Sequence, residues 1–322
     1  MSLKLPQLED VRQAATVLDG TAHRTPLLTS RSLSQRSGNE LYFKAEHLQR
    51  SGAFKFRGAF HALSRIHVAG AASTVVTQSS GNHAQALSLA GQILGLQVHV
   101  VMPEEAPEVK RRATIDYGAS IHPCLQTQED RMRVLRQVQQ DTRSHYVAPY
   151  DDPQVIAGQG TVALEMLQEL PALDALIIPV GGGGLLGGMA MTAKSMKPSI
   201  RVYGAEPVGA DDAHRSLIAG KPLPMHHPQT IADGLLTSLG DWTWPLIQSH
   251  VDDILTVSDS EITGAMTLLW SRMKQVVEPS GAVALAVALT EGFQSRHQSQ
   301  RIGVVLSGGN VDLSFFHRHK QP

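Results

Sequence analysis

Apolar positions follow two spacings along the chain, one typical of strands and one typical of helices. Short apolar and β-branched runs, which indicate strands, stand at residues 73–78, 96–103, 174–180, 200–207 and 301–306. Between them, other stretches repeat apolar residues at helical intervals, as Ala84, Leu87 and Ala90 do. Strands that alternate with amphipathic helices predict a wound α/β protein with mostly parallel sheets.

The loops that follow four of these strands are rich in glycine, serine or acidic residues. They read "SSGNH", "GGGGLLGG", "VGADDA" and "SGGN". Because ligands in open α/β sheets bind at the carboxyl ends of the strands, we expect the four loops to share one site. We also expect Ser80 or Asn82 to cap the helix that follows the first loop.

The composition of the chain indicates which kinds of partner are not expected to bind it and which cellular compartment suits it. The chain has 322 residues, of which 42% are hydrophobic and 18% charged, as in an ordinary globular protein of one or two domains. Its formal net charge of −1 gives no electrostatic reason to expect nucleic acid or a membrane surface as a partner. The N-terminal stretch has no apolar signal core, and the single cysteine, Cys124, fits a reducing compartment. We therefore expect a cytoplasmic protein that binds neither nucleic acid nor a membrane.

A tetraglycine at Gly181–Gly184 follows one predicted strand and precedes a helix. Bare backbone at the positive end of a helix forms a cradle for a phosphate. A competing interpretation uses Gly182, Gly184 and Gly187, which satisfy the G-x-G-x-x-G spacing, with Glu206 at the end of the next strand. That pattern is typical of a nicotinamide dinucleotide site and would indicate an NAD-dependent dehydrogenase.

Lys55 lies in the segment "SGAFKFRGA", with Phe54 and Phe56 on either side. Apolar surroundings disfavour an ammonium ion, which lowers the pKa of a lysine until its neutral amine can attack an aldehyde or accept a proton. Together with a phosphate cradle, such a lysine predicts pyridoxal 5′-phosphate, a phosphorylated aldehyde that reacts with lysine and stabilises charge at the Cα of an amino acid. The dinucleotide interpretation leaves Lys55 and two of the loops without a role.

A set of motifs spread over nearly the whole chain resembles one enzyme family. The segments are "SGAFKFRGA", "SSGNHAQAL", "VIAGQGT", "VGGGGLLGG", "GAEPVGADDA", "IADGL", "VVEPSGA" and "LSGGNVD". They resemble the fold type II pyridoxal-phosphate enzymes, specifically the serine racemase and serine/threonine dehydratase family. The resemblance implies a tryptophan synthase β-like fold with two wound α/β domains. It assigns residues 1–73 and 149–322 to a large cofactor-binding domain and residues 74–148 to a small mobile domain, in a homodimer.

The resemblance also implies the roles of individual residues. Lys55 would hold the cofactor covalently and act as the base on one face of Cα, while Ser80 would be the proton donor on the other face. The other cofactor-binding residues would be Phe54, Asn82, Gly181, Gly182, Gly183, Gly184, Glu278 and Ser307. The substrate would be bound by Ser79, Ser80, Asn82, His83 through its backbone, and Arg131.

Two reactions are expected from this arrangement, racemisation of serine and β-elimination from serine or threonine to a keto acid and ammonia. The threo-3-hydroxyaspartate ammonia-lyases of the family look similar too, and Arg131 would suit their side-chain carboxylate. Tyr150 stands where the racemase branch usually carries asparagine, and in this it resembles the dehydratases.

The acidic loop resembles the family's divalent-metal site. Its ligands would be Glu206, the main-chain carbonyl of Ala210, and Asp212. Hard oxygen ligands of this kind suit Mg²⁺, Mn²⁺ or Ca²⁺.

Overall fold

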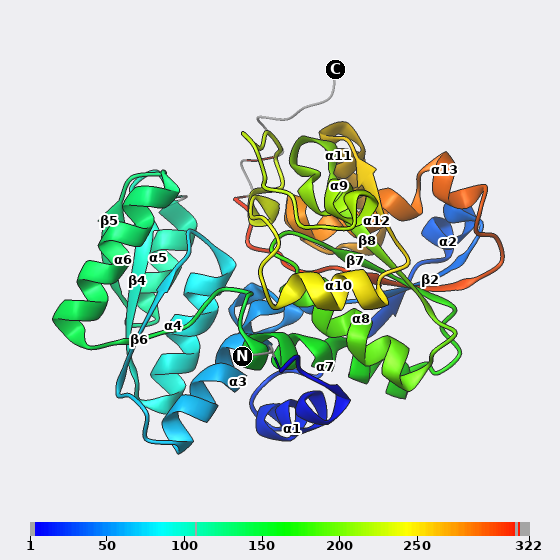
Figure 1. Ribbon diagram of the computed structural model, residues 1–322. Coiled ribbons are helices and arrows are strands. Elements are labelled where there is room, and N and C mark those ends of the chain that lie inside the picture. The colour runs from blue at the N-terminus through cyan, green and yellow to red at the C-terminus, as the bar shows by residue number, and fades with distance from the viewer. Residues whose placement is uncertain (1–3, 107, 313–314, 316–322) are drawn as a thin grey trace.

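The chain forms two sheets that lie side by side, each covered by helices (Figure 1). The computed structural model describes residues 4–106, 108–312 and 315. The first sheet contains β1 (Leu27–Thr29), β2 (Glu40–Lys44), β7 (Ala175–Pro179), β8 (Arg201–Pro207), β9 (Asp253–Val257) and β10 (Arg301–Val305). The second contains β3 (Thr74–Gln78), β4 (Gln97–Pro103), β5 (Ser120–Cys124) and β6 (His145–Tyr146). The five strands predicted from apolar runs are confirmed as β3, β4, β7, β8 and β10.

Strand order is β1-β2-β10-β7-β8-β9 in the first sheet and β5-β4-β3-β6 in the second. Neighbouring strands are parallel except for the pair β1 and β2. Parallel strands need helical crossovers, which place helices on both faces of a sheet. The predicted α/β class with mostly parallel sheets is therefore confirmed.

Helices around the first sheet are α1 (Leu8–Leu18), α2 (Arg31–Ser37), α7 (Pro153–Glu169), α8 (Gly184–Met196), α9 (Asp212–Ala219), α10 (Thr243–His250), α11 (Asp259–Leu268), α12 (Pro279–Ala288) and α13 (Glu291–Gln294). Those around the second are α3 (Lys55–Val68), α4 (Asn82–Leu94), α5 (Glu108–Asp116) and α6 (Gln128–Thr142). Short 3-10 helices are η1 (Glu46–Leu48), η2 (Arg50–Gly52), η3 (Val208–Ala210) and η4 (Asp233–Leu235), and η5 (Leu269–Met273) is a π-helix. Across the described residues, no helix has both the length and the apolar composition that a membrane span requires.

The core of the first sheet reflects its continuous apolar strands. Every residue of β7 is buried, and successive side chains enter opposite layers: Ile177 packs with α11 and α12, and Ile178 packs with α7 and α8. A strand covered on both faces has no reason to alternate apolar with polar residues. The run "ALIIP" is therefore explained by its central place in the sheet.

The second sheet is covered by α3 and α4 on one face, around Phe56 and Leu87, and by α6 on the other, around Leu135. Its strands fall between residues 74 and 146, and the division at 74–148 into a mobile domain stays a prediction. Helix α3 packs against both α4 and α7, so it contacts the layers of both sheets. Because Lys55 is the first residue of α3, it stands where the two sheets meet.

Candidate active site

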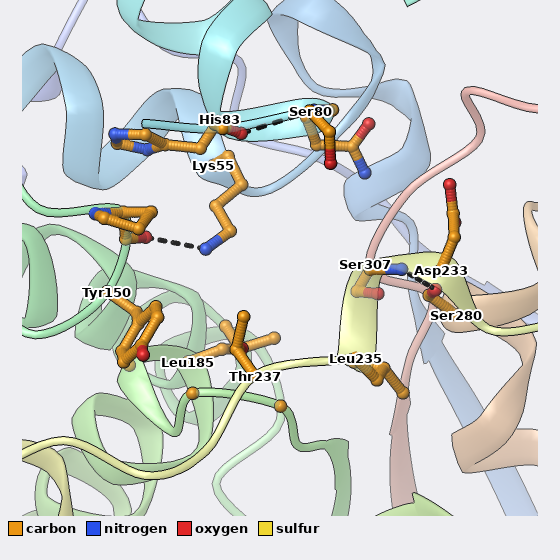
Figure 2. Close-up of a pocket in the computed structure, with 18 of the residues that line it drawn as sticks. Lys55, Ser80, His83, Tyr150, Leu185, Asp233, Leu235, Thr237, Ser280 and Ser307 are labelled. Atoms are coloured by element: carbon orange, nitrogen blue, oxygen red, sulfur yellow. Dashed lines mark hydrogen bonds between the residues drawn. The ribbon is translucent and has the colours of Figure 1, made fainter. Parts of the chain in front are cut away.

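A pocket lies between the two sheets, at the carboxyl ends of β3, β7 and β10 (Figure 2). The loop after each of these three strands lines the pocket. The lining residues are Ser79–His83 after β3, Gly181–Gly184 after β7 and Ser307 after β10. The fourth loop, at 208–212, is not part of the lining, so the expectation that all four loops share one site was wrong. Strand β8 lies two strands away from β10, and the carboxylate at its end faces α9 instead.

Lys55 is fixed in the pocket by the backbone just before it. Ala53 pairs with Gly308 in an isolated bridge, and the amide of Phe54 donates to the carbonyl of Ser307 at 3.0 Å. The Lys55 Nζ donates to the carbonyl of Pro149 at 2.7 Å and lies 5.2 Å from the centre of the Phe54 ring.

Burial lowers the pKa of Lys55 to about 8. None of the described carboxylates forms an ion pair with this amine to offset the cost of desolvating its charge. With this pKa, roughly a tenth of the amine is neutral at pH 7 and about half at pH 8, and the neutral amine is the nucleophilic and basic form.

The tetraglycine joins β7 to α8, whose first residue is Gly184. Gly183 adopts the left-handed conformation, with φ of 89°. A Cβ atom added at Gly182 would stand 2.4 Å from the ring of Tyr150, and one at Gly183 would stand 2.8 Å from Ile247. The site thus requires backbone without side chains at the positive end of a helix, as a phosphate-binding loop does.

The loop before α4 is arranged differently from the predicted cap. The N-cap is Gly81, and the hydroxyl of Ser79 accepts hydrogen bonds from the amides of Gly81 and Ala84, both at 3.3 Å. The prediction that Ser80 or Asn82 caps this helix was therefore wrong, because Ser79 already bonds the free amides. As a result, the Ser80 hydroxyl makes no hydrogen bond among the described residues and faces the pocket (Figure 2).

Asn82 reaches across the pocket toward the first sheet. Its Nδ2 donates to Glu278, and its Oδ1 accepts from Asn310 at 2.9 Å. Glu278 is buried at the N-terminus of α12, and burial raises its pKa to about 7. Ser307 is buried nearby at the end of β10. Asn82, Glu278 and Ser307, each assigned to the cofactor by resemblance, therefore line one pocket.

Two further pocket residues were missed by sequence reasoning. Lys110 of α5 and Asp233 of η4 both line the pocket, and they form an ion pair with each other. Asp233 belongs to the motif "IADGL", which was quoted without a role, and Lys110 lies in no motif at all. Only the folded chain brings the two residues together.

Two predicted substrate residues, His83 and Arg131, and the neighbouring pocket residue Gln78 carry polar atoms that lack partners. Both ring nitrogens of His83, the Nε of Arg131 and the Oε1 of Gln78 are buried without a hydrogen bond among the described residues. Burial and the charge of Lys55 hold the pKa of His83 well below its usual value, so its ring is neutral. Because a buried polar atom without a partner is costly, these groups favour a polar ligand in this part of the pocket.

The predicted metal ligands lie outside the pocket. The two carboxylate oxygens of Glu206 accept hydrogen bonds from the backbone amides of Ala213 and His214, at 3.0 and 2.9 Å. Both carboxylate oxygens of Asp212, by contrast, are buried without a hydrogen-bond partner among the described residues. Burial raises the pKa of Glu206 to about 8 and that of Asp212 to about 6. Within the described part of the chain, no group of three or more His, Cys, Asp and Glu side chains is placed to hold a metal ion. The proposed set has two carboxylates and a carbonyl.

The fold and the pocket together define a class of protein, an α/β enzyme whose pocket combines a glycine loop at a helix N-terminus with a buried lysine, which suits a phosphorylated aldehyde cofactor. The position of Glu206 argues against a dinucleotide site, because its carboxylate is engaged by α9 and cannot meet a ribose.

Comparison with known proteins identifies the family. The model for pyridoxal-phosphate dependent enzymes matches residues 18–308. Serine racemase from Dictyostelium discoideum is 45% identical over 310 residues, which cover 95% of each chain. Maize serine racemase superposes with a TM-score of 0.95 at 41% identity, covering 98% of this chain and 96% of the maize chain. A threonine deaminase, from T.th., superposes with a TM-score of 0.89 at 44% identity, covering 96% of this chain and 100% of the deaminase chain.

The chain belongs to the family of pyridoxal-phosphate dependent enzymes, in its fold type II branch with the serine racemases. The resemblance stated from the motifs is confirmed. The dehydrogenase alternative is excluded, because pyridoxal phosphate is the cofactor of this family.

Proposed function

We propose that the protein racemises serine and eliminates water from serine and threonine, with pyridoxal phosphate bound at Lys55. The observation that carries this proposal is that Lys55 and an unpaired Ser80 hydroxyl line the same pocket from different elements. Racemisation needs two such groups, because the proton that leaves one face of Cα must be replaced on the other. The names of the relatives, serine racemases and a threonine deaminase, support both reactions.

The residues present fit the cofactor. Gly181–Gly184 would hold its phosphate, Asn82 its ring oxygen, and Ser307 its pyridine nitrogen, with Phe54 beside the ring and Glu278 next to Asn82. When bound, pyridoxal phosphate supplies an electron sink for charge that develops at Cα. A neutral hydroxyl at Ser307 would leave the pyridine nitrogen largely unprotonated, which would make that sink weaker.

The two reactions share their first proton transfer. Once the substrate amine has displaced Lys55 from the cofactor, the freed, neutral Lys55 amine would take the proton from Cα. In racemisation, the Ser80 hydroxyl then donates a proton to the opposite face. In elimination, the proton that Lys55 removed is instead delivered to the β-hydroxyl, which leaves as water, and hydrolysis of the resulting enamine gives a keto acid and ammonia.

The substrate carboxylate would be held by Ser79, Asn82 and the backbone of His83, at the start of α4. The second candidate function, threo-3-hydroxyaspartate ammonia-lyase, is favoured by Arg131, whose buried Nε lacks a partner. Arg131→Met tests the choice between these functions. If hydroxyaspartate is the better substrate, this variant raises its KM by at least about tenfold and leaves the KM of serine within about twofold.

A divalent cation, Mg²⁺, Mn²⁺ or Ca²⁺, would bind Glu206, the carbonyl of Ala210 and Asp212. The unpaired, buried oxygens of Asp212 support this assignment. We expect Mg²⁺ to raise the thermal midpoint of the wild type after treatment with a chelator, and to leave Asp212→Asn unchanged. Equal stabilisation of both proteins would contradict the site. The homodimer and the cytoplasmic location stay predictions.

Product partition tests the main proposal. L-serine and, separately, L-threo-3-hydroxyaspartate are incubated with the cofactor-loaded enzyme and Mg²⁺, and the D-isomer and keto acid are quantified for the wild type and Ser80→Ala. The proposal predicts D-serine from the wild type, and keto acid without D-serine from the variant. Keto acid alone from both proteins would make the enzyme an ammonia-lyase, named by its faster substrate.

A further inference from the structure

Lys110 forms ion pairs that join a helix of the second sheet to segments that pack on the first sheet. It lies on α5 beside the second sheet and is 6% exposed. Its Nζ pairs with Asp233 and lies 3.7 Å from Glu278. Asp233 is in η4 and Glu278 precedes α12, so both carboxylates come from the layers of the first sheet.

The side chain of Lys110 also lies against the loop that carries Ser80. A Cβ atom added at Gly81 would stand 3.4 Å from the Cδ of Lys110 and 3.5 Å from its Nζ. The next residue, Asn82, bonds Glu278 directly. The backbone around Ser80 is therefore connected to carboxylates of the opposite sheet through both Lys110 and Asn82.

The charge on Lys110 is maintained by these contacts. Burial by itself would lower the pKa of Lys110, but the nearby carboxylates of Glu278 and Asp233 raise it above the ordinary value. An ammonium that stays protonated cannot act as a base in this pocket. Its contacts make it a fixed positive link between two carboxylates.

We propose that Lys110 is a positioning residue that holds the Ser80 hydroxyl at the second face of Cα, and that it thereby sets the ratio of racemisation to elimination. The inference rests on the proposed function. Elimination needs Lys55 to take the Cα proton and the β-hydroxyl to leave. Racemisation also needs a proton from Ser80, so a displaced loop impairs racemisation more than elimination.

The test compares Lys110→Met with wild type, measuring D-serine and pyruvate formed from L-serine by the cofactor-loaded enzyme. We expect the D-serine to pyruvate ratio to fall by roughly 10- to 100-fold, the loss typical of a reacting group displaced by about 1 Å. Pyruvate formation should stay within about threefold. Asp233→Asn, which removes the partner's charge with little change in shape, should lower the ratio in the same direction, and the effects of the two changes should not add in the double variant.

Lys194→Met is the matched control. Lys194 pairs with Asp252 at 2.7 Å, within the layers of the first sheet and away from the pocket. Lys194→Met should therefore leave the ratio of D-serine to pyruvate unchanged. As a second readout, amide hydrogen exchange in residues 79–84 should be faster in Lys110→Met than in Lys194→Met, with or without turnover.

The outcomes separate the two proposals. A wild type that forms no D-serine overturns the racemase function, and this inference with it. A wild type that forms D-serine, with an unchanged ratio in both Lys110→Met and Asp233→Asn, overturns the inference and leaves the racemase function standing. Equal losses of both products would overturn it as well, because they would assign Lys110 a purely structural role. If Lys110→Met does not fold, Asp233→Asn decides the question, because Asp233 is 44% exposed at its side chain and tolerates the change better.

Discussion

Replacing Lys55 by methionine should stabilise the protein when no cofactor is bound. The reason is that the pocket holds the Lys55 amine where its charged form is disfavoured. Methionine has a similar length and no charge to desolvate. The change therefore removes a cost that the folded state bears and the unfolded state does not.

The size of this cost follows from the pKa of Lys55. Burial lowers it to about 8, compared with about 10.4 for an exposed lysine, and each tenfold change in a proton equilibrium corresponds to about 1.4 kcal/mol. The ammonium thus costs the folded state about 3 kcal/mol at neutral pH. Losing the 2.7 Å hydrogen bond to the carbonyl of Pro149 offsets about 1 kcal/mol of this. We expect a net gain of about 2 kcal/mol.

The gain should depend on pH with a definite sign. Between pH 8 and about 10.4 the unfolded chain binds more protons at Lys55 than the folded chain does, so the stability of the wild type rises with pH in this window. Lys55→Met lacks this rise. Its advantage is therefore complete below pH 8 and is lost as the pH approaches 10.4.

Urea unfolding of the cofactor-free proteins at pH 7 and pH 10 measures the effect. Lys44→Met is the control, because we expect it to lower the free energy of unfolding where Lys55→Met raises it. Lys44 is buried as well, but its Nζ lies 2.6 Å from both Glu165 and the carbonyl of Thr25. Breaking this pair should cost about 3–5 kcal/mol. If Lys55→Met is less stable than wild type at pH 7, as Lys44→Met should be, the lowered pKa of Lys55 and the argument built on it are refuted.

Two further predictions concern the glycine loop and the buried ion pair of Arg57 with Glu46. In Gly182→Ala the new Cβ meets the ring of Tyr150, so absorbance titration should show pyridoxal phosphate affinity reduced at least about tenfold, at an overpacking cost of about 1–3 kcal/mol. Gly264→Ala, whose new Cβ meets no neighbouring side chain, should leave the affinity unchanged, and an unaltered affinity in Gly182→Ala would contradict the phosphate-binding role of the glycine loop. Arg57→Met removes the 2.8 Å pair with Glu46 and should lower the free energy of unfolding by about 3–5 kcal/mol at pH 7. Because Arg57 helps to hold the pKa of Glu46 below its usual value, the wild type loses this stability in acid below about pH 4.3. A variant that loses as much as the wild type there would contradict the argument.

The sequence predicts those parts of the site whose chemistry is local. The tetraglycine shows its requirement for bare backbone in four consecutive letters, and Lys55 shows its apolar setting through its neighbours in the chain. Strands β7 and β10 are apolar enough to be recognised without a fold. By contrast, β5 reads "SIHPC" and β6 has two residues, so neither carries a clear strand pattern.

Contacts between distant segments could not be predicted in this way. Lys110 meets Asp233 across 123 residues of chain, and Arg57 meets Glu165 across 108. Charged residues in a sequence usually indicate a solvated surface, but Lys44, Glu46 and Arg57 are buried because their charges balance inside the fold. Their burial depends on partners that only the tertiary structure supplies.

The helix cap before α4 shows why even a local rule can miss. Serine and asparagine are both good N-cap residues, so the sequence "SSGN" alone does not show which side chain accepts hydrogen bonds from the free amides at the start of the helix. In the structure, the Ser79 hydroxyl accepts these hydrogen bonds. Ser80 and Asn82 are left for other contacts, and these are the two residues that the proposed reaction needs in the pocket.

Buried polar atoms without a hydrogen bond among the described residues gather at the two proposed binding sites. Among the described residues, such atoms on Gln78, His83 and Arg131 line the pocket, and those on Asp212 belong to the proposed metal site. Each costs about 1–3 kcal/mol while it stays unpaired. Most buried polar atoms in native proteins are paired, so a concentration of unpaired ones at two sites indicates partners that arrive with ligands. We therefore expect bound pyridoxal phosphate to raise the free energy of unfolding of this chain.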